Sequence, residues 1–505
     1  MTTRRSPGGT VVLALDQGTS SSRTLVVDET GTILAVAQQK LERTYPQPGW
    51  VEQDPEELWQ AQRASAVEAL ARSGVSAGNV AALGITNQRE TTIVWDRATS
   101  EPIAPAIVWQ DRRTAPLCES LREAGHEALI RRRTGLLLDP YFCGTKLAWL
   151  LENVPLARER ALAGGLAFGT IDSWLTWKLT AGQRHVTDAT NASRTLLYDI
   201  HRGQWDDELL GLFGVPRAML PEVCDTSGVV GETEVAHLGA RIPIAALVGD
   251  QQAALFGQAC TVPGMAKATY GTGCFLLMHT GDTAPASSHG LLTTVALQRA
   301  GRRQYALEGS VFMAGAAIQW LRDGLRLFDD VGQSGVLAAD APESDGVYFV
   351  PALAGLGAPY WDAHARGAIL GLNGGTTTAH IARAALEGIA FQVADLYAAV
   401  AGDAGLQPGE LRVDGGAAAN DVLMQIQADI LGLSIARAAQ KEATALGAAS
   451  LAGLGVGLWE DETPMQTDWR ADRRFTPDPR TAREARLEGW HAAVASVRAF
   501  AAPEA

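Results

Sequence analysis

Short apolar runs alternate along this chain with longer segments in which apolar residues recur every three or four positions. The clearest short run covers 11–15, and a second covers 24–27 after a polar turn. Both are rich in Val and Leu, and apolar runs of this length bounded by polar turns are typical of buried strands. Two such runs joined by a short turn predict a β-hairpin.

A long helix is predicted directly after this first sheet segment. Asp54 can cap the helix, Pro55 suits its first position, and Glu57 completes a capping-box pattern. Gly74 marks the expected end of the helix. A helix among short strands indicates an α/β protein.

The second half of the chain repeats the pattern of the first. In the first half, strands are predicted over 80–86, 91–95 and 107–109. In the second half, strands are predicted over 265–270 and 274–278, and a Gly/Thr turn joins them. The later hairpin resembles the one that begins at residue 11. This similarity predicts an internal duplication.

Further elements complete the second half. Helices are expected over 314–328, 380–400 and 482–500, and a strand over 411–414. The charged, proline-bearing stretch 461–483 is expected to wrap the surface before the last helix.

The length and composition exclude several classes of protein. With 505 residues, 47% of them apolar, the chain is long enough for two domains, which we place at 1–258 and 259–505. A net charge of −14 argues against nucleic acid and anionic membranes as partners. No apolar run is long enough to span a bilayer. The five cysteines are scattered and odd in number, so they predict neither disulfides nor a zinc site, which fits a reducing cytoplasm.

Three glycine-bearing turns are the first candidates for chemistry. They read Asp16-Gln17-Gly18-Thr19, Gly271-Thr272-Gly273 and Asp414-Gly415-Gly416. Backbone N–H groups and hydroxyls suit phosphate oxygens, and a nearby carboxylate suits Mg²⁺. Each turn alone is equally consistent with an ordinary surface hairpin or with close strand–helix packing. Together the turns resemble the layout of two actin-like (ribonuclease H-like) ATPase domains with a central cleft, and no Walker or dinucleotide motif competes.

The segment Asn87-Gln88-Arg89-Glu90-Thr91-Thr92 lies between two predicted strands. One interpretation is a polyol site, in which Arg89 donates to hydroxyls and Glu90 accepts from them. The other is a surface ion pair, which contributes little stability. Trp109, Tyr141 and Phe275 are aromatics beside polar turns, suited to the carbon edge of a polyol or to an ordinary core.

Asp250 follows the apolar strand 244–248 and precedes a predicted helix. A carboxylate at the carboxyl end of a strand faces the crevice in which α/β proteins bind ligands. In a kinase such a group accepts the alcohol proton, whereas the alternative interpretation is a helix N-cap. Asp16 is also a candidate base, but Asp250 suits that role better, which leaves Asp16 for the metal.

These motifs, taken together, resemble the FGGY carbohydrate kinase family, and in particular its glycerol-phosphorylating branch. The resemblance extends from about residue 11 to about residue 457. It is carried by the turns and segments above and by Trp109-Gln110-Asp111-Arg112-Arg113-Thr114, Asp139-Pro140-Tyr141-Phe142-Cys143-Gly144-Thr145-Lys146, Asp250-Gln251-Gln252-Ala253-Ala254 and Gly355-Leu356-Gly357-Ala358-Pro359-Tyr360-Trp361-Asp362.

The resemblance implies transfer of phosphate from ATP to glycerol, giving ADP and sn-glycerol 3-phosphate, the entry step of glycerol catabolism. It implies a Mg²⁺ cofactor, a cytoplasmic location and a homodimer or homotetramer. The implied glycerol site is Arg89, Glu90, Trp109, Tyr141, Asp250, Gln251 and Phe275, with Asp250 as general base and Asp16 serving the Mg²⁺ through water. The implied nucleotide site is Thr19, Ser20, Ser21, Arg23 and Thr272 for the phosphates and Gly315, Gln319, Gly416 and Asn420 for the rest.

One segment departs from the family pattern. Some members carry a glycine-rich loop that binds fructose 1,6-bisphosphate as an inhibitor, and residues 232–241 lack it. Other members carry a phosphorylated His in this region, but the residues around His237 do not match, so we expect a plain surface His.

Two other functions remain open from the sequence. A different sugar kinase, for xylulose or gluconate, would share the nucleotide site and differ around Arg89 and Glu90. A non-catalytic ATP-binding sensor or structural protein would have lost its catalytic positions, and none is lost here.

Overall fold

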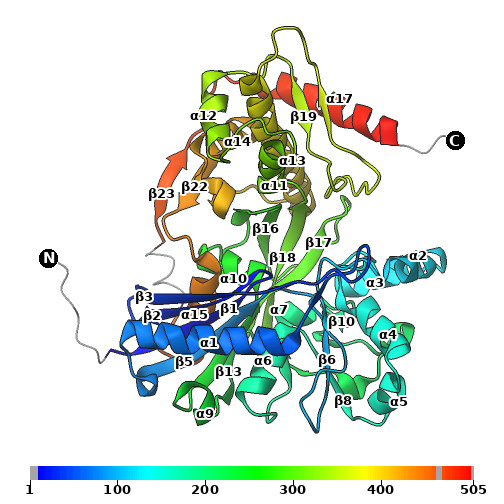
Figure 1. Cartoon of the computed structure of the whole chain (residues 1–505), viewed down its shortest axis with the longest axis vertical. Helices are drawn as coiled ribbons and strands as arrows, with labels where there is room; N and C mark the ends of the chain where they lie inside the picture. Colours follow the sequence, from blue (N-terminus) through cyan, green and yellow to red (C-terminus); the bar gives the residue numbers. More distant parts are fainter. Residues whose placement is uncertain (1–8, 462–468, 502–505) are drawn as a thin grey trace.

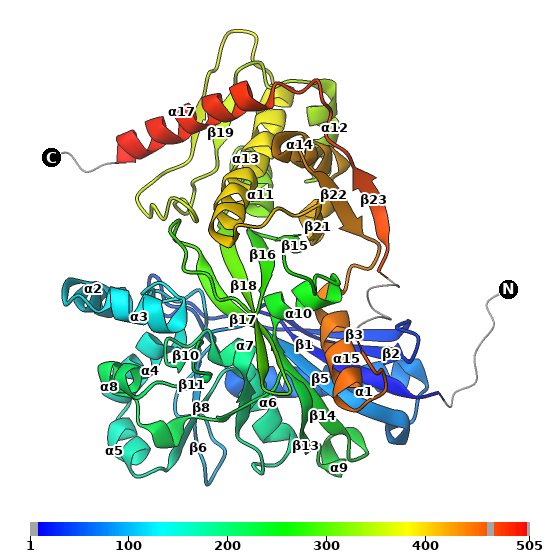
Figure 2. The ribbon, with the colours of Figure 1, turned by 180° about the vertical axis from the view of Figure 1, so that it is seen from behind.

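The computed structural model describes residues 9–461 and 469–501. It has two lobes stacked along its long axis, each built around a β-sheet (Figure 1). The lower lobe holds the N-terminal half and the upper lobe most of the C-terminal half, and Figure 2 shows the same division from behind. The α/β, actin-like fold expected from the sequence is confirmed.

The sheet of the lower lobe brings three strand ends to one edge. Its order is β13-β14-β5-β1-β2-β3, and β14, β5 and β1 run parallel. The strands are β1 (Val11–Gln17), β2 (Ser21–Asp28), β3 (Ile33–Lys40), β5 (Val80–Asn87), β13 (Ser227–Glu232) and β14 (Pro243–Gly249). Since parallel strands end together, Gln17 and Gly249 lie on either side of Asn87.

The sheet of the upper lobe repeats this arrangement. Its order is β17-β18-β16-β15-β21-β22-β23, so β15, β21 and β22 occupy the places of β1, β5 and β14. The strands are β15 (Ala266–Tyr270), β16 (Cys274–Gly281), β17 (Leu292–Arg299), β18 (Arg302–Val311), β21 (Glu410–Asp414), β22 (Ser434–Ala438) and β23 (Ala471–Phe475). The predicted duplication is therefore present in the strand order.

Helices cover both sheets and close the hydrophobic cores. In the lower lobe these are α1 (Pro55–Ser73), α6 (Ile171–Leu179), α9 (Val235–Leu238) and α10 (Asp250–Gly257), with the short β4 (Glu52–Gln53) and β7 (Ala106–Ile107) nearby. In the upper lobe they are α11 (Gly315–Asp323), α12 (Gln333–Asp340), α13 (Thr378–Ala404), α14 (Asp421–Leu431) and α17 (Arg483–Ala501), with β19 (Tyr348–Val350) and β20 (Ala368–Leu370). Most of α13 is buried in the core, although by length and composition alone it could cross a membrane.

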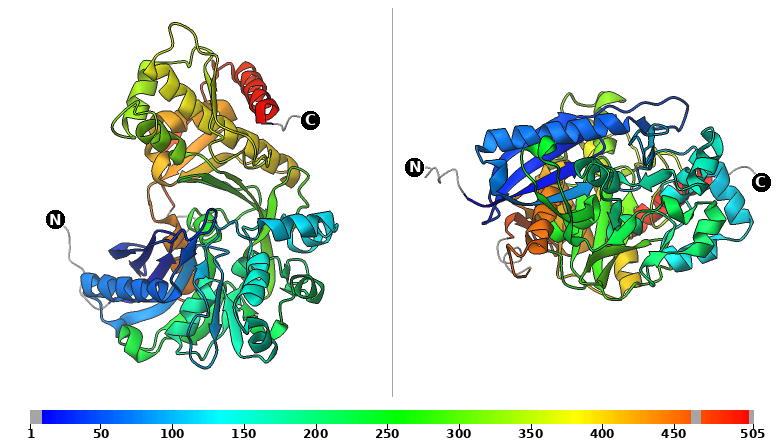
Figure 3. Two further views of the ribbon diagram at one scale, coloured as in Figure 1. Left: turned by 45° about the vertical axis from the view of Figure 1, so that its right-hand side comes forward. Right: turned by 90° about the horizontal axis from the view of Figure 1, so that it is seen from below.

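A helical extension flanks the lower sheet on the side of β17 and β18 (Figure 3). It contains α2 (Ala115–Glu123), α3 (Glu127–Thr134), α4 (Cys143–Asn153), α5 (Ala157–Leu162), α7 (Ala189–Ala192) and α8 (Asp207–Phe213). Its strands are β6 (Ile93–Asp96), β8 (Leu166–Gly169), β9 (Val186–Asp188), β10 (Tyr198–Asp199), β11 (Gln204–Trp205) and β12 (Glu222–Cys224). Leu292, Val295 and Tyr305 of β17 and β18 belong to its apolar core.

One helix of the C-terminal half of the chain packs in the lower lobe. Helix α15 (Ala443–Gly455) comes from the C-terminal half but packs on the lower sheet, where Ala448 and Leu451 join Val12 and Val248 in one core. Packing therefore does not divide the chain at a single point, and the boundary between residues 258 and 259 stays a prediction.

Two local expectations are wrong in detail, and a third segment contains a strand that the sequence did not predict. The helix predicted over 314–328 ends at Asp323, because the Leu325 N–H bonds to the Trp320 carbonyl, five residues back, and Arg326 takes a positive φ of 54°. Asp54 caps α1, but Glu57 accepts a hydrogen bond from the Glu42 N–H rather than completing a capping box. Within 461–483, residues 471–475 form β23 on the edge of the upper sheet, and residues 462–468 lie outside the described part of the chain.

Candidate active site

The strand ends of the lower sheet gather the predicted catalytic groups. Asp16 lies near the end of β1, Arg89 and Glu90 follow β5, and Asp250 follows β14. Because these three strands are parallel neighbours, residues far apart in the sequence share one edge of the sheet. This edge faces the upper lobe, as expected for a ligand site in an α/β fold.

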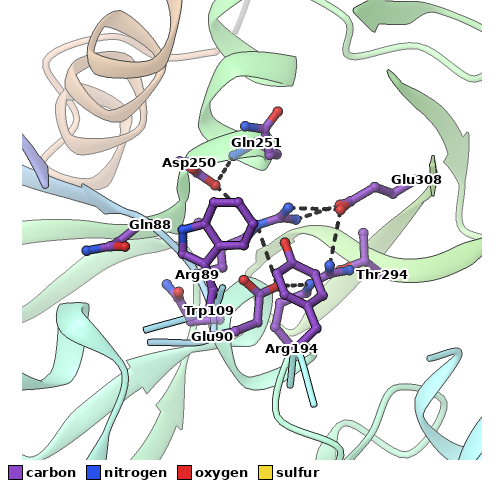
Figure 4. A network of polar contacts seen from close by, with 12 residues as sticks. Gln88, Arg89, Glu90, Trp109, Arg194, Asp250, Gln251, Thr294 and Glu308 are labelled. Atoms are coloured by element: carbon purple, nitrogen blue, oxygen red, sulfur yellow. Dashed lines mark hydrogen bonds and ion pairs between the residues drawn. The ribbon is translucent and has the colours of Figure 1, made fainter. Parts of the chain in front are cut away.

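Arg89 and Glu90 are buried, and each contacts a partner that the sequence did not reveal. Arg89 donates to both oxygens of Glu308, with Nη1–Oε2 and Nη2–Oε1 distances of 2.5 and 2.8 Å. Glu90 Oε1 accepts from Arg194 Nε at 2.6 Å, and Arg194 Nη2 also reaches Glu308 Oε1 at 3.1 Å (Figure 4). With 2% and 1% exposure, Arg89 and Glu90 are not a surface ion pair.

The four side chains form an alternating cluster of two arginines and two glutamates. Burial acts to raise the pKa of Glu308, but the Arg194 and Arg89 guanidiniums outweigh it and lower the pKa to about 2. Glu308 therefore stays ionised in the neutral range, whereas burial raises the pKa of Glu90, and Arg194 and Arg89 oppose that rise. Such a cluster is rigid, because each charge is held by hydrogen bonds to another.

Asp250 lies beside this cluster and faces the space between the lobes. Its Oδ1 accepts from the Gln251 N–H at 2.7 Å and lies 3.1 Å from Arg89 Nε, while 29% of its side chain is exposed. Burial raises the pKa of this carboxyl, and Arg89 and Lys267 oppose that rise. The N-cap of α10 is Gly249, so the alternative interpretation of Asp250 as the N-cap is wrong.

A buried hydrogen-bond network fixes the backbone that carries Asp250. The Gly249 N–H donates to Thr190 Oγ1 at 2.8 Å, and Thr190 donates to Asp188 at 2.9 Å. Asp188 also accepts from Thr226 Oγ1 at 2.8 Å. The sequence offered no signal for this network, because its members lie on different elements.

Gln251 is held by a buried lysine that was also missed. Lys267 Nζ donates to Gln251 Oε1 at 2.5 Å and to Thr269 Oγ1 at 2.8 Å. Lys267 is fully buried, and burial lowers its pKa. A lysine within the apolar strand β15 was the available signal, since buried lysines require a partner.

The predicted aromatic residues are half-buried near these groups. Trp109 Nε1 donates to Thr19 Oγ1 at 3.0 Å, and its ring meets Tyr141 edge-on with centroids 5.7 Å apart. Phe275 pairs with Thr269 across β15 and β16. Trp109 therefore joins the polyol candidates to the first phosphate turn, while the roles of all three aromatics stay predictions.

The β1–β2 turn and the β15–β16 turn, which are the candidate phosphate-binding turns, each expose a hydroxyl between paired strands. In the β1–β2 turn the Gly18 N–H donates to the Ser21 carbonyl, and Ser20 is exposed. In the β15–β16 turn Thr272 is exposed, and its carbonyl accepts from the N–H groups of Ala314 and Ala316. This second turn therefore lies at the start of α11.

The remaining nucleotide candidates are placed near these turns by the same elements. Gly315 begins α11 and has no room for a Cβ, which would lie 2.6 Å from the Gly271 carbonyl oxygen. Gln319 and Gly416 are exposed. Asn420 caps α14 by accepting from the N–H groups of Val422 and Leu423, and Arg23 pairs with Glu442. Their contacts with a nucleotide stay predictions.

Asp16 is half-buried near the carboxylates of Asp250 and Glu442, as expected of a carboxylate that binds a cation. Burial raises its pKa to about 7, Asp250 and Glu442 add to that rise, and Arg23 opposes it. Within the described residues no group of three or more His, Cys, Asp or Glu side chains could hold a metal alone. Mg²⁺, which prefers one or two carboxylates together with phosphates and water, fits such a site.

Comparisons with known proteins place the chain in a family. The N-terminal and C-terminal domains of the FGGY family of carbohydrate kinases match residues 11–257 and 266–456. The chain belongs to the FGGY family. Glycerol kinase of Dechloromonas aromatica is 59% identical over 96% of both chains, and that of Trichlorobacter lovleyi is 57% identical over 97% of this chain and 99% of the relative. The crystal structure of Plasmodium falciparum glycerol kinase with ADP is 36% identical, with a TM-score of 0.91 over 97% of this chain and 98% of that one.

Residues 232–241, for which the sequence predicts a departure from the family pattern, contain the short helix α9. His237 packs edge-on against Trp59, with ring centroids 5.0 Å apart. Burial and the neighbouring Arg63 lower the pKa of His237. It is thus half-buried rather than a freely exposed surface His, and the absence of the inhibitor loop stays a prediction.

The position of Lys267 in this FGGY chain leads to a pH prediction. Lys267→Met removes a positive charge that lowers the pKa of Asp250, so that pKa rises. If Asp250 must be ionised to act, activity is lost at higher pH as the solution is acidified. We expect the acidic limb of the kcat/KM profile to move up by about one pH unit. The control is Lys178→Met on α6, which pairs with Glu56 away from the site and is expected to leave the limb in place.

Proposed function

We propose that this chain transfers the γ-phosphoryl group of ATP to a terminal hydroxyl of glycerol, giving ADP and sn-glycerol 3-phosphate. The observation that carries the proposal is the open carboxylate of Asp250 at the end of β14, beside the buried Arg89–Glu90 pair. The relatives named glycerol kinase, at 54–59% identity over nearly the whole chain, support the choice of glycerol.

Asp250 acts as the general base in this proposal. Its Oδ2 takes no hydrogen bond from the described residues, and a carboxylate there can accept the hydroxyl proton as the oxygen attacks the γ-phosphorus. Arg89, Glu90 and Gln251 hold the hydroxyls of glycerol. Phosphoryl transfer needs little else from the protein than positioning and charge stabilisation.

The two turns hold the nucleotide from both lobes. Thr19, Ser20, Ser21 and Arg23 contact the phosphates from below and Thr272 from above. Gly315, Gln319, Gly416 and Asn420 contact the rest of ATP. Asp16 would hold Mg²⁺ through water, and the ion would supply positive charge beside the phosphates. Trp109, Tyr141 and Phe275 cover the carbon edge of glycerol and exclude water, which would otherwise accept the phosphate.

A substrate panel tests this function against the other sugar kinases. ADP release, measured by a coupled assay, is expected to be fastest with glycerol and weak with xylulose and gluconate, with dihydroxyacetone between them. The reason is that relatives at 54–59% identity over nearly the whole chain are named glycerol kinase. A higher kcat/KM with xylulose or gluconate would contradict the proposal, and no turnover with any of the four would favour the non-catalytic sensor.

A cytoplasmic location and a homodimer or homotetramer remain predictions. The five cysteines are all free, which agrees with a reducing compartment.

A further inference from the structure

Arg89 has three carboxylates within 4 Å, those of Glu90, Asp250 and Glu308, and only Glu308 occupies its two terminal nitrogens. Glu308 accepts from Nη1 and Nη2, whereas Asp250 Oδ1 lies 3.1 Å from Nε alone (Figure 4). Bidentate pairs of a guanidinium with a carboxylate are the strong ones. Glu308 therefore competes with Asp250 for the same guanidinium and takes the stronger pairing.

Glu308 is buried and is held in the position from which it pairs with Arg89. It is 1% exposed, and its Oε1 is fixed a second time by Arg194 Nη2. Arg194 is held in turn by Glu90. Glu308 comes from β18 of the C-terminal half, where it pairs with Leu277 and Leu292 in the sheet. The orientation of Arg89 is thus set by a strand outside the segment that carries the predicted glycerol motif.

On the basis of the function proposed above, we propose that Glu308 is a positioning residue for phosphoryl transfer. By occupying both terminal nitrogens of Arg89, it prevents a bidentate Arg89–Asp250 pair. The Oδ2 oxygen of Asp250 is then left free to accept the proton of the attacking hydroxyl.

The charges around Asp250 give the direction of the expected change. Arg89 and Lys267 lower its pKa, Glu308 raises it, and the negative charge of Asp16 interacts with it from β1. Loss of the Glu308 charge removes one negative neighbour and also lets the guanidinium of Arg89 approach. Both effects lower the pKa of Asp250, which is opposite to the effect of Lys267→Met.

The test is Glu308→Gln, which keeps the size of the side chain and removes its charge. A crystal structure of the unliganded variant is expected to show the Arg89 guanidinium turned onto both oxygens of Asp250. The acidic limb of the kcat/KM profile is expected to move down by about one pH unit. We expect kcat to fall by about tenfold or more, because the base is weaker and its free oxygen is occupied. A guanidinium that stays in place, or an unmoved limb, overturns the proposal.

Glu387→Gln on α13 is the matched control. Glu387 is also a buried glutamate paired with two arginines, Arg383 and Arg486, at 2.7 and 2.8 Å. It lies on α13, which packs in the hydrophobic core of the upper lobe, so the acidic limb of the kcat/KM profile is expected to stay in place. A shift of the same size in this control overturns the proposal, since the effect would then not be local.

A second variant and the separate crystal structure keep this test decisive. If Glu308→Gln does not fold, Glu308→Asp is measured in the same two ways, because a carboxylate one carbon shorter releases part of the guanidinium. If the unmodified protein does not phosphorylate glycerol, the proposed function fails, while the crystal structure still decides the role of Glu308.

Discussion

Asp250→Asn is expected to abolish turnover of glycerol, with kcat lower by about 10²–10⁴-fold, the usual contribution of a general base. Asn has the shape of Asp but cannot accept the hydroxyl proton, so the attacking oxygen stays protonated. The residues proposed to contact ATP lie on other elements, so nucleotide affinity is expected to stay nearly unchanged. A coupled assay of ADP release measures the first effect and calorimetric titration with ATP the second.

Asp282→Asn is the matched control for this loss. Asp282 is exposed and pairs with Arg302 at the end of β16, away from the strand ends of the lower sheet. Its substitution is expected to leave both kcat and ATP affinity unchanged. Near-normal turnover in Asp250→Asn would rule out Asp250 as the base.

Gly447→Ala is expected to destabilise the protein by about 1–3 kcal/mol, the usual cost of overpacking. Gly447 on α15 lies against α10, and a Cβ there would come within 2.0 Å of the Ala253 carbonyl oxygen. The neighbouring atoms belong to the main chain, so the helices themselves must move apart. The midpoint of thermal unfolding measures this loss.

Gly402→Ala is the control with the same chemical change. Gly402 is exposed on α13, and the nearest atom to its new Cβ is 3.9 Å away. Ala favours a helix over Gly by up to about 1 kcal/mol, so this variant is expected to unfold at the same or a higher temperature. Equal destabilisation of both variants would contradict a close contact between α10 and α15.

Local patterns predicted the elements well because neighbouring residues determine them. The hairpin of β1 and β2 follows from two apolar runs and a polar turn, and α1 lies between its caps Asp54 and Gly74 as expected. Patterns failed where a distant partner decides. Nothing within 461–483 indicates that residues 471–475 pair with β22, and the exchange of α15 between lobes leaves no local trace.

The candidate site divides in the same way. Asp16, Arg89, Glu90 and Asp250 could be found because each lies near the end of a recognisable strand or directly after one. Arg194 and Glu308 could not, since they belong to elements that meet the first group only in the folded chain, and the signal for Lys267 was its place within an apolar strand. Their importance comes from whom they contact, and contacts across the chain are not encoded in spacing.

By itself the sequence determined the α/β class, the duplicated hairpins, the family resemblance and the residues with the right chemistry for phosphoryl transfer. The tertiary structure alone decided how those residues are held: that Glu308 takes the terminal nitrogens of Arg89, and that Asp250 keeps an exposed oxygen. The physical reason is that residue types and local periodicity follow from the chain, whereas the orientation of a buried charge depends on every charge that folding brings within a few ångströms of it.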